Sequence, residues 1–436
     1  MKKKIMIFFL ALISCVNIHA ENEVTIIAVG EAEEDKTSLS FEFSYDQKLK
    51  EAELKELKNV AQIIKDDFAF YKHKFEIKSE KPQYTSKIGF EVQDNKVKSH
   101  LLVINQIKGE TVLDLKNDVW MNNIRGFSHD MANKAFQAIT GKNSIFKTKI
   151  VFVSDRNSSK RKLVKELYIM DFDGERKQRL TFKKSLVIAP SISPDNQKIL
   201  FSAIEARWIK SKSPRQSVQK VQNLNLYVYD IASRKTELIS DNKGINSGAI
   251  FNKSGDSIYL TLSNQKNADI YKMNLSDKSL TQITTHFSTD VDPHINHNES
   301  LLTFLSSRHG KANIYTKEML TPSKKVTRVS YVGQFNAAPR FNPEGDEIVF
   351  SSWVDNRFDI YRIGSDGRNL VRLTKNFGSN EEPWFSPDGE FIIFTSQKVI
   401  SSKNAVQNIH IMTRDGELVK QLTNGFGKVY TPRWSN

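Results

Sequence analysis

The feature that most constrains the fold is a motif that recurs along the C-terminal two thirds of the chain. It combines an apolar pair, a Ser-Pro-Asp-Gly type of turn and an alternating apolar run, as in WFSPDGEFIIFTS from Trp384. Related copies begin at Ser191 (SISPDNQKILFSA), Arg340 (RFNPEGDEIVFSS) and Ile250 (IFNKSGDSIYLTL). A dipeptide precedes each turn and recurs every ~45 residues, a period typical of four-stranded propeller blades. The six dipeptides are Ala189-Pro190, Ser247-Gly248, Asp292-Pro293, Ala338-Pro339, Glu382-Pro383 and Thr431-Pro432.

A third strand also recurs six times, and its copies are offset from the dipeptides. The copies centre on Tyr168, Tyr227, Tyr271, Tyr315, Tyr361 and His410. The first unit, near Lys147, has no dipeptide before it, and the last dipeptide has no unit after it. A closed ring accounts for both facts, because the C-terminal strand then completes the first blade and hides its edge. The sequence therefore predicts a six-bladed β-propeller over residues 143–436.

Residues 21–142 contain no blade motif and predict a small α/β domain. Apolar residues at helical spacing between Leu57 and Phe68 indicate one helix. A second helix is expected from Ser128 to a stop at Gly141. Strands are expected over residues 88–92, 100–107 and 111–115. The predicted fold class is mainly β, a propeller preceded by an α/β domain.

Residues 1–20 have the pattern of a secretory signal peptide. Three lysines precede the apolar run from Ile5 to Leu12, and cleavage is expected between Ala20 and Glu21. Cys15 offers an alternative, because the residues before it resemble a lipoprotein cleavage box and a lipid there would tether the protein. Cleavage at Ala20 leaves no cysteine, which suits an oxidising periplasm. The net charge of +14 is spread along a secreted chain, so we do not expect nucleic-acid binding.

Two further segments have open interpretations. The run from Val24 to Val29 is β-prone, so it either adds a strand to a partner's sheet or forms the first strand of its own domain. Residues 205–223 lengthen one blade and carry five basic residues. A partner-binding loop is one interpretation, and a solvated, poorly ordered insertion is the one that we expect.

The whole mature chain resembles the TolB family. The resemblance rests on the order of an α/β domain and six blades, on the junction AITGKNSIFKTKIVFVSD from Ala138, on LYIMDFDGERKQRLT from Leu167 and on the closing TPRWS from Thr431. The start of the mature chain, from Glu23 to Ile26, is also similar to the family's N-terminal segment. The resemblance implies a periplasmic scaffold of the Tol–Pal envelope system that supports outer-membrane integrity and cell division.

The family resemblance implies two partners. It places the peptidoglycan-associated lipoprotein Pal at the mouth of the propeller, at positions that match Ala189, Ser247 and Asp292, and TolA at the N-terminal segment. The candidate TolA-binding residues are Glu23, Val24, Ile26, Ile27, Val29 and Gly30. Outer-membrane lipoproteins and peptidoglycan are further candidate partners, and a monomer without cofactor or metal is expected. The sequence departs from the family at Gly244, where members can carry a histidine, so the detailed Pal contacts are expected to differ.

The turns that lead into the innermost strands are expected to surround the axial channel. The candidate Pal-binding residues are Ala189, Asn246, Ser247, Asp290, Asp292, Asn336, Ala338, Glu381, Glu382 and Thr431. Their acids predict an electronegative rim that would attract a basic patch or a helix N-terminus.

Enzymatic alternatives find little support in the residues. A serine hydrolase needs a G-x-S-x-G elbow, and the stretch from Gly126 to Asp130 lacks the second glycine. A polysaccharide lyase with a channel metal would need more ligands than His294 and His297, for which we expect surface positions. A lipid-anchored binding propeller outside the Tol–Pal system is the remaining alternative.

Overall fold

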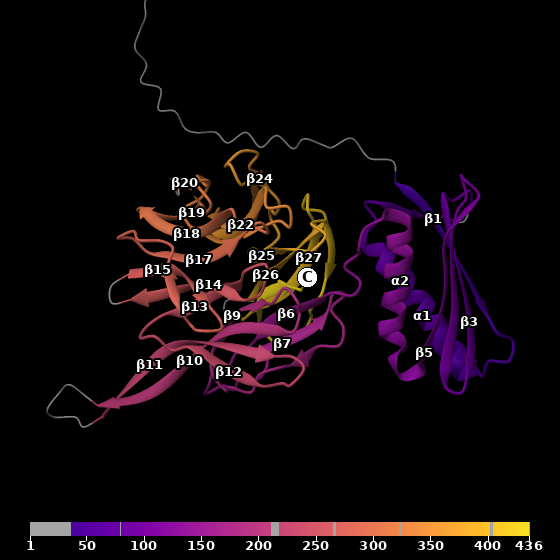
Figure 1. The fold of residues 1–436 in the computed structure, drawn as a ribbon, viewed down its shortest axis with the longest axis horizontal. Helices are drawn as coiled ribbons and strands as arrows, with labels where there is room; N and C mark the ends of the chain where they lie inside the picture. The colour runs from indigo at the N-terminus through magenta and orange to yellow at the C-terminus, as the bar shows by residue number, and fades with distance from the viewer. Residues whose placement is uncertain are drawn as a thin grey trace, which may run out of the picture.

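The computed structural model describes residues 36–78, 80–210, 218–264, 267–321, 325–401 and 404–435, with the backbone alone at 207–210, 218–221 and 264. Within these ranges the chain forms one five-stranded sheet followed by six four-stranded sheets arranged as a propeller (Figure 1). The predicted fold class is confirmed. Among the helices that the structure describes, none has the length and hydropathy needed to cross a bilayer.

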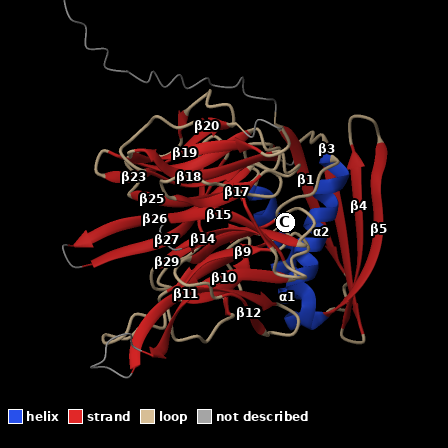
Figure 2. Ribbon diagram, turned by 60° about the vertical axis from the view of Figure 1, so that its left-hand side comes forward, coloured by secondary structure: helices blue, strands red, loops and turns tan. Residues whose placement is uncertain are grey.

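The N-terminal domain packs two helices against one face of a sheet with strand order β2-β1-β3-β4-β5. Its strands are β1 (Thr37–Tyr45), β2 (Phe75–Ile77), β3 (Tyr84–Gln93), β4 (Lys96–Asn105) and β5 (Glu110–Trp120). Its helices are α1 (Glu51–Phe70), the 3-10 turn η1 (Met121–Asn123) and α2 (Ile124–Thr140). Figure 2 shows both α-helices between this sheet and the propeller.

Both expected helices are present, with one shifted start. In α1 the predicted apolar residues from Leu57 to Phe68 are buried, as an amphipathic helix requires. Helix α2 ends as predicted at Gly141, which has a left-handed φ of 73°. The start predicted at Ser128 is wrong, because α2 begins at Ile124 and the Ser128 hydroxyl donates to the Ile124 carbonyl one turn back.

The six blades follow one another around the axis, each with its first strand innermost. The first complete blades in the chain contain β9 (Val187–Ile192), β10 (Lys198–Lys210), β11 (Val218–Asp230) and β12 (Thr236–Ser240), then β13 (Asn246–Phe251), β14 (Ser257–Asn264), β15 (Asn267–Asn274) and β16 (Leu280–Gln282). The next contain β17 (Asp290–Ile295), β18 (Leu301–His309), β19 (Lys311–Glu318) and β20 (Val326–Arg328), then β21 (Asn336–Phe341), β22 (Glu347–Val354), β23 (Arg357–Gly364) and β24 (Val371–Arg372). The fifth contains β25 (Ser379–Phe385), β26 (Phe391–Ser401), β27 (Asn404–Thr413) and β28 (Leu418–Gln421).

The sixth sheet joins the two ends of the propeller sequence. Its order is β29-β6-β7-β8, with β29 (Val429–Trp434) innermost, β6 (Lys149–Ser154), β7 (Glu166–Asp171) and β8 (Gln178–Arg179). Strand β29 is antiparallel to β6, with Arg433 opposite Val151 and Trp434 opposite Ile150. The Trp434 indole N–H donates to the Thr148 hydroxyl over 2.7 Å and the ring is buried. The C-terminal strand thus removes the open edge that β6 would otherwise present.

The long blade departs from the expected loop. Strands β10 and β11 pair continuously from Lys198 opposite Asp230 to Lys210 opposite Val218, and the hairpin projects from the propeller (Figure 1). The expectation of a poorly ordered insertion is therefore wrong for 205–210 and 218–223, whose backbone continues the ladder. Residues 211–217 lie outside the described ranges.

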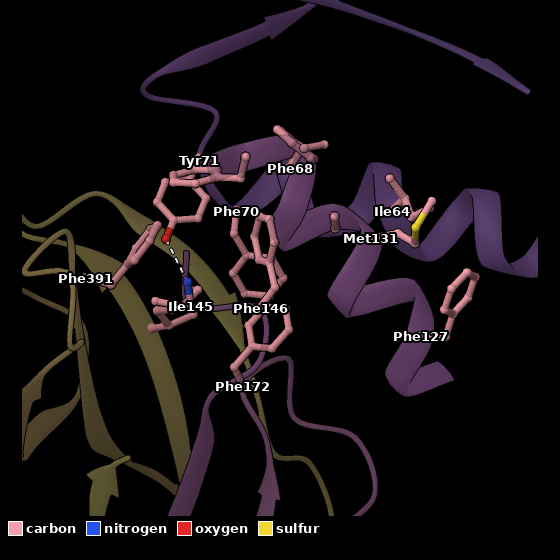
Figure 3. Packing of buried hydrophobic residues seen from close by; sticks show 14 of the residues in the cluster. Ile64, Phe68, Phe70, Tyr71, Phe127, Met131, Ile145, Phe146, Phe172 and Phe391 are labelled. Carbon is pink, nitrogen blue, oxygen red and sulfur yellow. Dashed lines mark hydrogen bonds between the residues drawn. The ribbon is translucent and has the colours of Figure 1, made fainter. Parts of the chain in front are cut away.

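One hydrophobic cluster runs from the N-terminal domain into the last and closing blades. It includes Phe68 and Tyr71 of the domain, Phe146 of the linker, and Phe172 and Phe391 of the propeller. Figure 3 shows these rings facing one another across the junction, with the Tyr71 hydroxyl accepting a hydrogen bond from the Ile145 N–H over 3.0 Å. The same hydroxyl donates to Asp388. Because apolar and polar contacts coincide here, we expect the domain to be firmly attached to the propeller.

Candidate functional site at the axial channel

Each innermost strand carries one residue in the left-handed region of the backbone map. These residues are Ala189 (φ 50°), Gly248 (61°), Asp292 (54°), Ala338 (52°), Glu382 (57°) and Thr431 (46°). The register of each inner strand against its neighbour shifts at this point, as a β-bulge requires. The repeated bulge turns the strand at the same height in every blade, so equivalent residues face the axis together.

The inner strands form a complete ring. Each contacts the inner strand of the next blade, and β29 contacts β9. A Cβ placed on Gly248 would lie 3.6 Å from the Cα of Asp292, which shows how closely two bulges approach. We call the half-exposed residues at this end of the channel the rim. The rim consists of Ala189, Ser247, Gly248, Asp292, Glu381, Glu382 and Thr431.

The structure corrects the alignment of one blade. The expected dipeptide was Ser247-Gly248, but the left-handed position falls on Gly248 and the proline of the other blades is replaced by Ala249. Ser247 precedes the bulge and stays half exposed at the rim. Glycine suits this position, because it adopts a positive φ without the steric cost of a side chain.

Four of the predicted site residues are buried. Asn246, Asp290 and Asn336 are fully buried in β13, β17 and β21, and Ala338 is 3% exposed. The Asn246 amide donates to the backbone carbonyls of Leu224 and Asn242, and the Asn336 amide donates to the Asn313 side chain and the Val332 carbonyl, so each asparagine binds the preceding blade or the turn that follows it. The expectation that these four side chains surround the channel is wrong, because they are buried between the blades, where the polar ones find hydrogen-bond partners.

The acids of the rim are neutralised by arginines, so the expected electronegative rim is wrong. Asp292 accepts a hydrogen bond from Arg340 over 2.7 Å, and Glu382 accepts one from Arg433 over 2.7 Å. Each arginine lies on the inner strand of the following blade, and its side chain is only 4% exposed. The buried Asp290 pairs in the same way with Arg308 of its own blade, at 2.8 Å.

Glu381 differs from the paired acids. Burial and the neighbouring charge of Glu382 raise the pKa of Glu381 to about 7. Near neutral pH this carboxyl is therefore divided between its protonated and ionised forms. The rim thus offers two paired carboxylates and one carboxyl that can donate or accept a hydrogen bond.

Below the rim the channel is filled by an aromatic ring and two guanidinium groups. Arg340 and Arg433 lie 5.4 and 4.9 Å from the centre of the Trp384 ring, within range of cation–π attraction. His294 meets the same ring edge to face at 5.1 Å, and its Nδ1 accepts a hydrogen bond from the Phe341 N–H. His294 is half-exposed and lines the axial channel, and His297 is exposed, as expected.

The sequence prediction missed this central group, although a signal for it exists. Each of these residues directly follows the proline of a dipeptide: His294 after Pro293, Arg340 after Pro339, Trp384 after Pro383 and Arg433 after Pro432. The bulge two positions earlier directs equivalent side chains of different blades toward the axis. Among the described residues, no group of three or more His, Cys, Asp or Glu side chains is arranged to hold a metal ion.

The remaining predicted sites cannot be placed. The expected TolA-binding residues from Glu23 to Gly30, the cleavage site at Ala20 and Glu21, and Cys15 all lie outside the described residues.

The closed ring of six four-stranded sheets, preceded by an α/β domain, defines the chain as a six-bladed β-propeller protein. A family model described as "TolB beta propeller domain" matches residues 136–436. The chain belongs to this TolB propeller family.

Related proteins agree with that assignment. The Tol-Pal system protein TolB of Francisella tularensis subsp. mediasiatica is 26% identical over 321 residues, covering 72% of this chain and 69% of the relative. The protein of the same description from Ruthia magnifica subsp. Calyptogena magnifica is 28% identical over 313 residues, with 72% and 69% coverage. The crystal structure of TolB from Acinetobacter baumannii superposes with a TM-score of 0.73 at 20% identity, covering 93% of this chain and 98% of that one. This structural likeness shows that the two chains share their fold.

Proposed function

We propose that this protein is a periplasmic scaffold of the Tol–Pal system that binds Pal at the rim of the propeller. The observation that carries the proposal is the ring of half-exposed residues Ala189, Ser247, Asp292, Glu382 and Thr431, each at or directly before a bulge of the inner strands. These residues stand on paired strands, so a partner would meet a preorganised surface and lose little free energy in ordering it.

The chemistry of the rim favours a partner that is recognised by shape and hydrogen bonds. Asp292 and Glu382 are fixed by Arg340 and Arg433, so their remaining lone pairs have defined directions. The pairs carry no large net charge, and the rim therefore selects its partner by position more than by long-range attraction. This description fits a scaffold, and we propose no catalytic step for it.

A titration with Pal tests the proposal. Wild-type protein should bind Pal in isothermal calorimetry, and Ser247→Arg should weaken binding by at least about tenfold, because the long side chain would obstruct the rim. Ser279→Arg makes the same substitution at an exposed residue on the outer part of the same blade and should bind as wild type does. If both variants bind Pal as tightly as wild type does, the rim is not the binding site for Pal.

We further propose that residues Glu23 to Gly30 bind TolA, on the strength of their similarity to the family's N-terminal segment. Deleting residues 21–30 should abolish capture of TolA in a pull-down and leave the Pal titration unchanged. Capture of TolA by the deleted protein would show that the binding residues lie elsewhere.

The periplasmic location and the role in outer-membrane integrity and cell division belong to the same proposal. Mass spectrometry of the mature protein distinguishes a soluble periplasmic protein from a lipid-anchored one. A free N-terminus at Glu21 supports a soluble periplasmic scaffold. A lipid-modified Cys15 would instead support a tethered protein.

A further inference from the structure

A cavity of about 550 Å³ opens at the end of the axial channel opposite the rim. The residues Ser191, Ile250, His294 and Trp384, each two positions beyond a bulge, line its inner part. The turns between first and second strands surround its mouth, with Lys253 among them. Its volume lies within the ~300–1,000 Å³ that small-molecule sites usually occupy.

The N-terminal domain lies beside this mouth and leaves it open. Tyr71 donates to Asp388, which follows Pro387 of the lining, and Lys74 pairs with Glu390 at 2.5 Å. The described residues that line the cavity all come from the propeller. A ligand could therefore enter between the domain and the axis without separating the two.

The described lining of the cavity carries one positive charge, that of Lys253, and no negative charge. Among the described residues that line it, none is Asp or Glu, whereas Lys253, His294 and His297 are present. Acids lie next to the lining. Glu299 accepts hydrogen bonds from Asn252 and Tyr259 and lies 3.5 Å from Lys272, Asp388 binds Tyr71, and Glu344 is exposed beside Pro343. An anion inside the cavity would therefore meet no carboxylate of the described lining itself.

His294 supplies a hydrogen-bond donor in the inner part of the cavity. Its Nδ1 accepts from the Phe341 N–H over 3.1 Å, so the proton of the neutral ring must lie on Nε2. Burial, with the nearby charges of Arg340 and Arg433, holds the pKa of His294 well below its ordinary value. The ring therefore stays neutral, and its Nε2–H is available as a donor over the whole physiological pH range.

A buried cation lies next to the cavity without lining it. Arg340 contacts the face of Trp384, a lining residue, and its Nε has no hydrogen-bond partner among the described residues. The Trp384 ring, which contacts Arg340 and His294, provides an apolar surface in the inner part of the cavity.

We propose that this cavity binds a small organic anion, a carboxylate or phosphate ester carried on a ring, with its charged group on His294 and Lys253 and its ring against Trp384. The site is independent of the proposed partner surface, since it opens at the other end of the channel. A carboxylate and a phosphate share the acceptor oxygens that the donors require, and separate probes distinguish them.

Matched probes test the proposal with the full mature chain. Binding would be measured by calorimetry or ligand-detected NMR with benzoate, phenyl phosphate and neutral benzamide, and with glucuronate, glucose 6-phosphate and neutral glucose. At least one anion should bind about tenfold more tightly than the neutral member of its set, because a hydrogen bond to a charged group is worth ~1.5–3 kcal/mol. Equal binding of neutral and anionic probes, or no binding of any anion, would overturn the proposal.

Variants locate the site. Lys253→Gln should weaken the bound anion about threefold, whereas Lys235→Gln, an equal loss of charge on an exposed outer turn, should have no effect. His294→Leu should weaken it about tenfold, and His294→Gln, whose amide can both accept from Phe341 and donate to the ligand, should restore much of the affinity. If His294→Leu does not fold, the lysine pair still decides the outcome, and equal affinities of its two members would contradict the assignment.

Discussion

The guanidinium of Arg433 donates a hydrogen bond to the carboxylate of Glu382 over 2.7 Å. The bond joins the last strand of the chain to the inner strand of the blade before it, while β29 also pairs with β6. The Arg433 side chain is 4% exposed and Glu382 is 31% exposed, so the pair is buried on the arginine side. Closure of the ring thus depends on an ion pair as well as on a strand ladder.

Breaking this pair should destabilise the protein. Glu382→Gln leaves the Arg433 charge buried without its carboxylate and should lower the free energy of unfolding by about 2 kcal/mol, somewhat less than for a fully buried pair. Urea unfolding measures the change. Asp366→Asn breaks the exposed pair with Arg368, at 3.7 Å, and should stay close to wild type. A Glu382 variant as stable as this control would show that the pair contributes little to closure.

Substitution of Glu381, the neighbouring acid, should stabilise the protein, and the size of this effect should depend on pH. The pKa of Glu381 is about 7 in the folded protein and lower in the unfolded chain, so the folded state binds more protons between the two values. The stability that this group contributes is therefore lost as pH rises through 7. Glu381→Gln should stabilise the protein at pH 8 by on the order of 1 kcal/mol, after allowance for its exposure, and change little at pH 5. Thermal unfolding at both pH values measures this, and an equal effect at the two would contradict the raised pKa.

The junction of the two domains predicts the effect of removing one hydroxyl. Tyr71→Phe takes away the donor to one oxygen of Asp388 and the acceptor for the Ile145 N–H. The buried N–H and that oxygen then lack a partner, while the other Asp388 oxygen keeps its bonds from Ser386 and Glu390. The free energy of unfolding should fall by about 2–3 kcal/mol. Differential scanning calorimetry should also show whether the domain now unfolds before the propeller. Tyr331→Phe removes a hydroxyl from a residue that is 73% exposed and serves as the control. Equal melting of the two variants would mean that the Tyr71 bonds do not stabilise the junction.

Closure by the C-terminal strand predicts a large cost for truncating Trp434. The side chain is 3% exposed, and Trp434→Ala should lower the free energy of unfolding by about 3–5 kcal/mol. Trp120→Ala provides a matched control, because Trp120 is 54% exposed on the N-terminal domain. The difference between the two variants in urea unfolding measures the contribution of the closing strand to the core. A cost for Trp434 no greater than that for Trp120 would contradict it.

The sequence predicted the propeller well because its information is local and repeated. Each turn motif of the type Ser386-Pro387-Asp388-Gly389 fixes a tight hairpin by its own residues, and six dipeptides at similar intervals leave few architectures open. In the N-terminal domain, β1 (Thr37–Tyr45) was missed, although its burial alternates from Phe41 to Tyr45. Its partners β2 and β3 lie parallel and distant in sequence, so no local turn indicates the pairing.

The channel was less predictable for a similar reason. The partner of Asp292 is Arg340, and that of Glu382 is Arg433, each one blade further along the chain. Counting acids in the turns therefore gave the wrong charge for the rim. The burial of Asn246 and Asn336 follows from blade contacts that the spacing of the repeats does not reveal.

The most direct test of the account is a footprint of Pal on the protein by hydrogen–deuterium exchange. The proposed function predicts that Pal slows exchange in peptides that contain the bulges at Ala189, Gly248, Asp292, Glu382 and Thr431, and leaves the turns at Lys253 and Pro387 unchanged. Protection confined to those turns, or to the outer strands of the blades, would contradict binding at the rim.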